Sequence, residues 1–308
     1  MHKYILKRLL MMIPIVLGVT FVIFSMTYIT PGDPAVMALG EAAPPEAIEA
    51  LREEMGLNYP FLIQYANYIL RLLQGDLGTS PVTRRPVFQE IIDRFPTTLS
   101  LAFYGTVLSV LVGVPLGIVS ATRQYSIFDT AATGAGLLAV SIPNFWLGMM
   151  LILAFSLNLG WLPPTGLETW RGWILPVITL GTGSAALVMR ITRSSMLEVI
   201  RQDYIRTARA KGQKESLIVW RHALRNALIP VVTAVGLDFG FLLGGAVLTE
   251  TIYALPGLGR FMVDSIRTRD FPIIQGGVLF LAIVFSLVNL LVDILYAYID
   301  PRIKSQYK

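Results

Sequence analysis

Six apolar runs, each long enough to cross a lipid bilayer as a helix, constrain this chain more than any other feature. A helix needs about twenty predominantly apolar residues to span the hydrocarbon core. Only 15% of the 308 residues are charged, which leaves too few polar side chains for a water-facing surface. The sequence therefore predicts an all-α polytopic membrane protein with six transmembrane helices, at approximately Leu9–Ile29, Thr98–Ser120, Thr130–Leu157, Ile174–Met189, Leu228–Leu248 and Gln275–Tyr298.

The first run has two interpretations. It follows Lys3, Lys7 and Arg8, as the apolar core of a cleaved signal peptide would. However, the run is longer than a signal core, and no small-x-small cleavage site follows it. A retained membrane anchor is therefore predicted.

The basic residues predict the orientation. Most Lys and Arg residues lie in the N-terminal tail, the 121–129 turn, the 190–227 loop and the C-terminal tail, which six crossings place on one side. By the positive-inside rule, both termini are expected in the cytoplasm. The expected organisation is an N-terminal tail with the first helix over 1–30, an external segment over 31–97, and a five-helix core over 98–308.

The external segment is too long for a bare loop and too short for an independent domain of ordinary size. Pro44 to Arg52, Phe61 to Leu73 and Val87 to Phe95 have the spacing of short amphipathic helices. We expect them to lie against the outer membrane face. The residues do not decide between a solvated cap and a segment that touches substrate.

Two membrane runs carry small residues at every fourth position. This spacing lets helix backbones approach closely in lipid, so it predicts helix packing and not a particular function. The residues are Gly105, Ser109, Gly113 and Gly117 in the second run, and Gly236, Gly240 and Gly244 in the fifth.

Two carboxylates fall inside membrane runs. An ionisable group in the bilayer is costly and usually faces a partner or water, so Asp238 and Asp293 are candidate residues of a transport pathway. Asp293 lies near the cytoplasmic end, where it could simply cap or pair.

The residue inventory excludes the common enzyme classes. No G-x-x-x-x-G-K-[ST] phosphate loop is present, so nucleotide hydrolysis by the common route is excluded. There is no cysteine, and neither His2 nor His222 lies in a membrane run, which removes a thiol nucleophile, an intramembrane histidine base and a histidine metal centre. We expect no catalytic, cofactor or metal site in this chain. The net charge of +5 is attributed to the basic residues that orient the chain in the membrane, and no nucleic-acid binding is expected.

The 190–227 loop carries the most informative pattern. Ser194 or Ser195 can cap a helix and Gly212 can end one, so a short helix outside the membrane is predicted. Ala208, Ala210 and Gly212 would give this helix a small face that another protein could approach. An ordinary basic loop is the alternative, and the residues alone leave both open. The candidate contact residues are Asp203, Tyr204, Arg206, Ala208, Arg209, Ala210, Lys211, Gly212, Arg221, His222, Leu224 and Arg225.

This loop resembles the Glu-Ala-Ala loop of permease subunits in ABC importers, whose pattern is E-A-A-x3-G-x9-I-x-L-P. With Gly212 as the fixed glycine, Ala208 falls on the second alanine and Leu224 on the leucine. Arg206, Thr207, His222 and Arg225 depart from the pattern. The form D-Y-I-R-T-A-R-A-K-G with R-H-A-L-R-N-A-L-I-P is similar to the variant of the dipeptide, oligopeptide and nickel branch.

Four further stretches along the chain are similar to that branch, in the same order. They are Pro31 to Pro34, Gly75 to Gly78, Glu250 to Tyr253 with Pro256 to Arg260, and Asp293 to Ile303.

The resemblance implies a permease in a bacterial or archaeal inner membrane that forms half of a translocation pathway. A homologous second permease, two cytoplasmic ATPase subunits that hold ATP and Mg, and an external solute-binding protein would complete the importer. The loop helix would sit in a groove of an ATPase and rock the bundle between inward-open and outward-open states.

The expected cargo is a di- or oligopeptide, including glutathione-like ones; a nickel chelate is less favoured because no membrane run holds histidine or cysteine. From a different class, the alternative is an ATP-independent transporter or channel that uses Asp238. A structural membrane scaffold is a further alternative.

Overall fold

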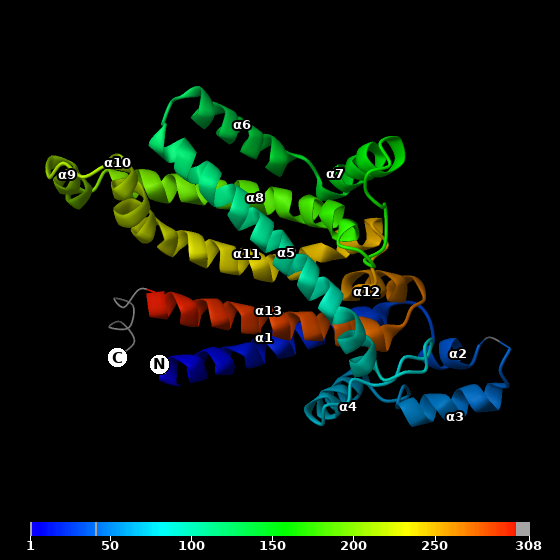
Figure 1. Ribbon diagram of the computed structural model, residues 1–308. Coiled ribbons are helices and arrows are strands. Elements are labelled where there is room, and N and C mark those ends of the chain that lie inside the picture. Colours follow the sequence, from blue (N-terminus) through cyan, green and yellow to red (C-terminus); the bar gives the residue numbers. More distant parts are fainter. Residues whose placement is uncertain (1, 41, 300–308) are drawn as a thin grey trace. The chain divides into compact units, whose positions relative to one another are not determined.

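The computed structural model describes residues 2–40 and 42–299 as helices joined by short connections (Figure 1). Within these ranges there is no strand, only an isolated bridge between Thr79 and Pro86. The helices are α1 (His2–Ile29), α2 (Pro34–Leu39), α3 (Pro45–Met55), α4 (Phe61–Leu73), α5 (Val87–Thr122), α6 (Ile127–Ser141), α7 (Asn144–Leu151), the π-helix η1 (Ile152–Asn158), α8 (Arg171–Ile200), α9 (Asp203–Ala210), α10 (Glu215–Leu217), the π-helix η2 (Ile218–Ala223), α11 (Leu224–Ile252), α12 (Leu258–Arg267) and α13 (Phe271–Ile299).

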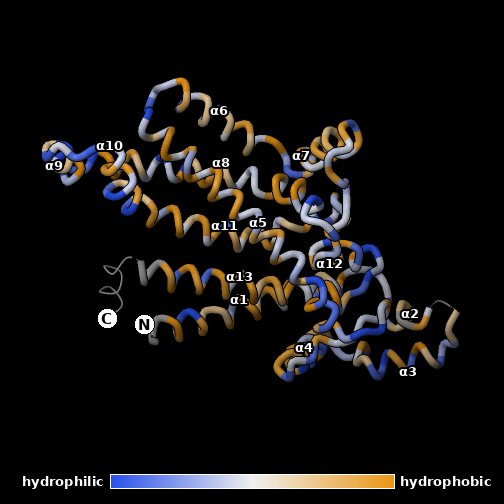
Figure 2. The backbone as a smooth tube through the Cα atoms, in the orientation of Figure 1, coloured by the Kyte–Doolittle hydropathy of each residue, from blue (hydrophilic) through white to orange (hydrophobic). Residues whose placement is uncertain are grey.

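Five helical stretches of the described chain are long and apolar enough to cross a membrane, and a bent pair of helices brings the number to as many as six. This confirms the predicted all-helical polytopic fold. Hydrophobic residues line the long helices, whereas hydrophilic ones gather at α3 and at the α9–α10 segment (Figure 2). The five stretches are Ile5–Ile29, Val87–Thr122, Arg171–Ile200, Glu215–Ile252 and Phe271–Leu295.

The third predicted run, Thr130–Leu157, is not a single straight helix. It consists of Ile127–Ser141 and Asn144–Asn158, bent by 99° at the short break between them. Pro143 explains the break, because proline has no N–H to donate and disfavours helical geometry at the residue before it. Ile142 accordingly has an extended backbone, with φ −79° and ψ 122°.

The chain forms two compact units, which are described separately. The first unit comprises Thr97–Arg260 and the described parts of Met1–Ile5 and Val284–Lys308. The second unit comprises Leu6–Pro96 and Phe261–Ile283.

In the first unit, the small residues permit the close helix approach that their spacing predicts. A Cβ built on Gly113 would lie 2.6 Å from the carbonyl oxygen of Ala185, so α5 passes directly against α8. A Cβ on Gly240 would lie 3.1 Å from the ring of Phe285 in α13. Gly244 differs, since its Cβ would meet no described atom within 4 Å.

The glycines of the two ladders that have a near neighbour meet side chains or backbone of the facing helices. Gly105 faces Leu180 and Leu242, Gly117 faces Met189 and Thr192, and Gly236 faces Val292.

In the second unit, α4 packs on α1 through aromatic side chains. Phe24 stacks on Tyr68 with ring centroids 5.4 Å apart, and Phe61 contacts Phe21 edge-on at 5.9 Å. The hydroxyls of Tyr65 and Thr20 lie 3.0 Å apart, which adds a polar contact to the same surface.

Helices α3 and α4 confirm the first two amphipathic predictions. The third is wrong as a separate helix, because 87–95 forms the first turns of α5.

The predicted 190–227 loop is shorter in the structure. Helix α8 continues to Ile200, and the next long helical stretch begins at Glu215, so residues 201–214, which include α9, link the two. Ser194 and Ser195 therefore lie inside α8 and cap nothing. The helix continues beyond the two serines because the apolar residues Met196 and Leu197 pack in a hydrophobic cluster. This packing outweighs the local preference of serine for a capping position.

Candidate functional site

Helix α9 is the element that the sequence singled out, and two of its side chains anchor it in the first unit. Ile205 is completely buried and Ala208 is 9% exposed. They join a hydrophobic cluster drawn from α5, α8, η2 and α11. The other buried members are Ile118, Ala121, Met196, Ile218, Val219, Ala223 and Ala227, and Leu224 packs against them half-buried.

The rest of α9 is exposed and polar. Asp203, Tyr204, Arg206 and Arg209 all face solvent in this chain, and Asp203 lies 3.6 Å from Arg206. Figure 1 shows α9 beyond the end of α8 at the tip of the first unit's helices. An amphipathic helix with only two buried side chains therefore presents most of its surface outward.

Side-chain hydrogen bonds fix this exposed surface. Nε and Nη2 of Arg209 donate to the two carboxylate oxygens of Glu215, at 3.1 and 2.6 Å. These bonds raise the pKa of Arg209 above its usual value, so its charge is permanent. Nδ2 of Asn226 donates to the hydroxyl of Tyr204 at 3.0 Å.

Gly212 ends the α9 turn, as its spacing predicts. Its φ of +75° is left-handed, and its N–H donates to the carbonyl of Arg209 at 2.9 Å. Gln213 then donates its N–H to the Ala208 carbonyl at 3.3 Å and brings its side chain 2.8 Å from the His222 ring. This is the glycine C-terminal cap that satisfies the last helical carbonyls.

The three small residues do not form one exposed face. Ala208 is buried, whereas Ala210 and Gly212 are exposed. Residues two apart on a helix point in roughly opposite directions, since each residue turns the helix by about 100°. Lys211, Arg221 and Arg225 are exposed alongside, so the outward surface of this segment is basic rather than small.

The structure adds an ion pair between a half-buried arginine and a buried carboxylate, close to this cluster, that sequence reasoning missed. Arg193 of α8 donates from Nε and Nη2 to the two carboxylate oxygens of Asp129 in α6, at 2.8 and 2.9 Å. Ser120 of α5 also hydrogen-bonds Asp129, and the Asp129 side chain is 6% exposed. Arg193 is one helical turn from Met196 in the cluster. The pair therefore joins three helices beside the α9 anchor.

Glu250, near the end of α11, belongs to a stretch that carries the family resemblance, but the sequence assigned no role to it. It is fully buried and accepts hydrogen bonds from Thr98 at 2.6 Å and from the Arg260 N–H at 3.0 Å. Tyr253 follows, with its hydroxyl 2.8 Å from that of Thr179. The motif from Glu250 to Arg260 thus shapes a buried polar turn.

The two membrane carboxylates have different settings. Asp238 is half-buried in α11 with Ser184 of α8 as its polar neighbour. Among the described residues, its Oδ2 has no hydrogen-bond partner. Asp293 is half-buried in α13, and the signature beyond residue 299 lies outside the described residues.

No group of three His, Cys, Asp or Glu residues that could hold a metal ion occurs in the described part of the chain.

These features define a class: a polytopic helical membrane protein whose spans are linked by a firmly anchored polar helix. The chain belongs to the family of binding-protein-dependent transport system inner membrane components, which matches residues 113–305. Residues 1–102 match the N-terminal region of such membrane components.

The similarity to curated relatives extends over nearly the whole chain. The chain is 48% identical to the glutathione transport system permease protein of Pectobacterium atrosepticum, over 99% of each chain. It is 46% identical to the dipeptide transport system permease protein of Alkalihalophilus pseudofirmus, over 99% of this chain and all of the relative. This chain is therefore a permease subunit of an ABC importer, as the resemblance implies, and the stand-alone transporter is not favoured. Its relatives are transport subunits and not enzymes.

Solved structures show a similar fold. The inward-facing MetNI methionine ABC transporter matches 69% of this chain and 97% of its own, with a TM-score of 0.56 at 20% identity. The crystal structure of an amino acid ABC transporter with histidines covers 70% of this chain and 94% of its own chain. Its TM-score is 0.53, and its sequence identity is 19%.

Proposed function

We propose that this permease imports short peptides as half of a translocation pathway, paired with a homologous permease. Two cytoplasmic ATPase subunits with ATP and Mg, and an external binding protein, complete the assembly. The names of its relatives support dipeptides and glutathione-like peptides over nickel chelates. Both termini are cytoplasmic by charge, in a bacterial or archaeal inner membrane, with segments 1–30, 31–97 and 98–308 as an anchor, an external region and a core.

The observation that carries this proposal is the construction of α9. Its polar side faces outward, while Ile205 and Ala208 hold it on helices α5, α8 and α11. A partner that moves α9 must move those helices too, because Ile205 and Ala208 are packed among their side chains. ATP binding to the ATPases can bias the transporter only through contacts that differ between its states, and α9 supplies them.

Reconstitution tests the function directly. The tagged chain is purified from its native membrane with whatever co-purifies and placed in liposomes, and uptake of labelled Gly-Leu is measured with and without ATP and binding protein. Recovery of a second permease and ATPases with ATP-dependent uptake is expected. Uptake by the chain alone without ATP would overturn the proposal.

Gly212→Asp tests the contact surface. The left-handed residue has no described atom within 4 Å of an added Cβ, so the new carboxylate would stand on the outward surface. ATP-dependent uptake should fall about tenfold or more while the subunits still co-purify. Gly75→Asp is the matched control, since Gly75 has φ +80° and equally open space in the second unit. Normal uptake by the Gly212 variant would remove this residue from the coupling surface.

A further inference from the structure

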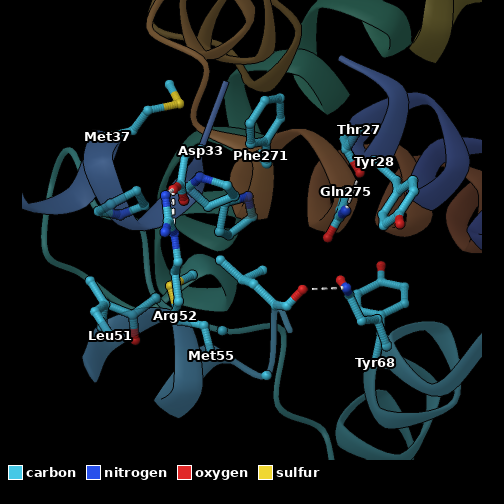
Figure 3. Close-up of a pocket in the computed structure, with 18 of the residues that line it drawn as sticks. Thr27, Tyr28, Asp33, Met37, Leu51, Arg52, Met55, Tyr68, Phe271 and Gln275 are labelled. Atoms are coloured by element: carbon cyan, nitrogen blue, oxygen red, sulfur yellow. Dashed lines mark hydrogen bonds and ion pairs between the residues drawn. The ribbon is translucent and has the colours of Figure 1, made fainter. Parts of the chain in front are cut away.

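The second unit contains a cavity that the coupling site does not explain. Its volume is about 870 Å³, within the range of pockets that hold small ligands. Its walls come from α1, α2, α3, α4, the start of α13 and the connections between them (Figure 3). All lining residues belong to this one unit.

One part of the wall is apolar and aromatic. Tyr28, Met37, Leu51, Met55 and Phe271 surround the space in Figure 3. Such a lining can bury a hydrophobic side chain of a ligand and tolerate variation in its shape, because methionine is flexible and polarisable.

The charged part of the wall has an excess of arginine. Four arginines and two aspartates line the cavity, and Asp33 is already paired with Arg52. Within the described residues, Arg71 and Arg84 form no ion pair, and Arg269 donates from Nη1 to the Pro31 carbonyl at 2.9 Å. The remaining positive charge fits an anionic group, and arginine binds a carboxylate through two parallel hydrogen bonds.

Two of these arginines have an unusual backbone. Arg84 has φ +56° and Arg269 has φ +55°, in the left-handed region that favours glycine. A bulky side chain there carries strain, and strained residues cluster at ligand sites. Both positions thus maintain a costly conformation at the edge of the cavity.

Tyr68 gives an independent indication of a missing partner. Its side chain is 7% exposed, and its hydroxyl has no hydrogen-bond partner among the described residues. Figure 3 shows the ring reaching into the same space as Gln275. Burial raises the pKa of Tyr68 to about 12, so the hydroxyl stays a neutral donor at physiological pH. A buried donor without a partner costs stability, which a ligand carbonyl or carboxylate would restore.

We propose that this cavity is a substrate site of the N-terminal region, which binds a short peptide with its carboxylate toward Arg84 and Arg269 and its side chain against the aromatic wall. The inference rests on the proposed function of peptide import. A metal ion does not fit, since the described residues offer no ligand cluster, and a bare acyl chain would leave the arginines and Tyr68 unpartnered.

The test measures direct binding to the intact membrane complex in nanodiscs of zwitterionic phosphatidylcholine, without the external binding protein. The probes are labelled Gly-Leu and its C-terminal amide, which lacks the carboxylate. Gly-Leu should bind about tenfold more tightly than the amide, and Arg84→Gln and Arg269→Gln should each weaken it about tenfold. Tyr68→Phe should weaken it several-fold with little change in fold, because only the hydroxyl is lost.

Arg267→Gln is the matched control, because Arg267 is exposed, lies two residues from Arg269 and does not line the cavity. Equal affinity for Gly-Leu and its amide, or unchanged binding in all three cavity variants, would overturn the inference. Displacement of Gly-Leu by phosphatidylglycerol vesicles would overturn it in favour of a lipid headgroup. If the wild-type importer takes up Gly-Leu with ATP yet the variants bind normally, this inference alone fails. Absence of ATP-dependent uptake would instead defeat the proposed function.

Discussion

The α9 segment and the α2–α4 region both consist of short helices outside the long spans, yet they are held by different forces. Helix α9 has eight residues and buries two of them completely or nearly so in a cluster from four other elements. Helix α3 has eleven residues and buries none, whereas α2 buries Ala35 and α4 buries only Tyr68. Ion pairs at the surface, such as Arg52 with Asp33, take the place of a core in α3.

The difference teaches how each region can respond to a partner. Buried apolar contacts make a segment move with the helices beneath it, whereas regions with few buried contacts open locally at low cost. Helix α9 is therefore suited to transmit a displacement. The α2–α4 region, with its lined cavity, is suited to accept a small molecule. The following variants test whether the two regions differ in this way.

The largest effect is expected for Ile205→Asp, which places a carboxylate in the cluster under α9. Burial of an unpaired charge costs about 3 kcal/mol or more, so α9 should detach from the bundle. ATP-dependent uptake should be lost, and limited proteolysis should cut within residues 201–214.

Thr207→Asp is the control for Ile205→Asp, because Thr207 is exposed on the same helix. It should leave the proteolysis pattern unchanged. An Ile205→Asp variant as protease-resistant as the wild type would remove the contrast between α9 and the α2–α4 region.

An intermediate effect is expected at the ion pair between Arg193 and the buried Asp129 carboxylate. Arg193→Met leaves the Asp129 carboxylate buried without its partner, at a cost of about 3 kcal/mol in the free energy of unfolding. The double variant Arg193→Met with Asp129→Leu should recover most of this loss, because both charges are removed together. Thermal unfolding of the purified complex measures each step. Additive losses in the double variant would show that the pair does not couple α6 to α8.

The smallest effect is expected for Asp33→Asn in the α2–α3 ion pair. The side chains of Arg52 and Asp33 are 38% and 24% exposed, so solvent screens the attraction and the loss should be about 0.5 kcal/mol. A loss as large as that of Arg193→Met would contradict the view that surface pairs hold this region weakly.

The same pair has a defined pH dependence. Partial burial acts to raise the pKa of Asp33, but hydrogen bonds from Arg52 and the Ala35 N–H outweigh it and hold the pKa below its usual value. A carboxyl with a depressed folded pKa stabilises the fold above its unfolded pKa of about 3.9 and loses this contribution as the pH falls through the folded pKa. The difference in Tm between wild type and Asp33→Asn should therefore be constant from about pH 7 to 5 and shrink below about pH 4.

Local patterns in the sequence predict much of this molecule. Apolar runs locate the spans, and the left-handed Gly212 ends α9 where its spacing indicates, because each depends on residues close in the chain. Pro143 is visible in the sequence, but counting apolar residues ignores the hydrogen bond that proline cannot make, so the bend in the third run is missed.

Contacts between distant residues are not predictable in this way. Arg193 and Asp129 are 64 positions apart, and Thr98 and Glu250 are 152 apart. Nothing in either local pattern indicates its partner, since only the packing of helices brings them together. The cavity of the second unit depends likewise on residues from 24 to 275, which no spacing rule connects.

The bend between α6 and α7 restricts what can surround that part of the chain. At the break the Ile142 N–H still donates to the Leu138 carbonyl at 3.1 Å, but Pro143 has no N–H to donate, so the series of backbone hydrogen bonds is interrupted. Hydrocarbon offers no substitute for a lost backbone hydrogen bond, and interrupted helices at membrane depth persist only against protein or water. Acyl chains are thus excluded as neighbours of these peptide groups. Because the sequence contains no cysteine, a single thiol placed at Ser141 would report whether water reaches this break, without any background label.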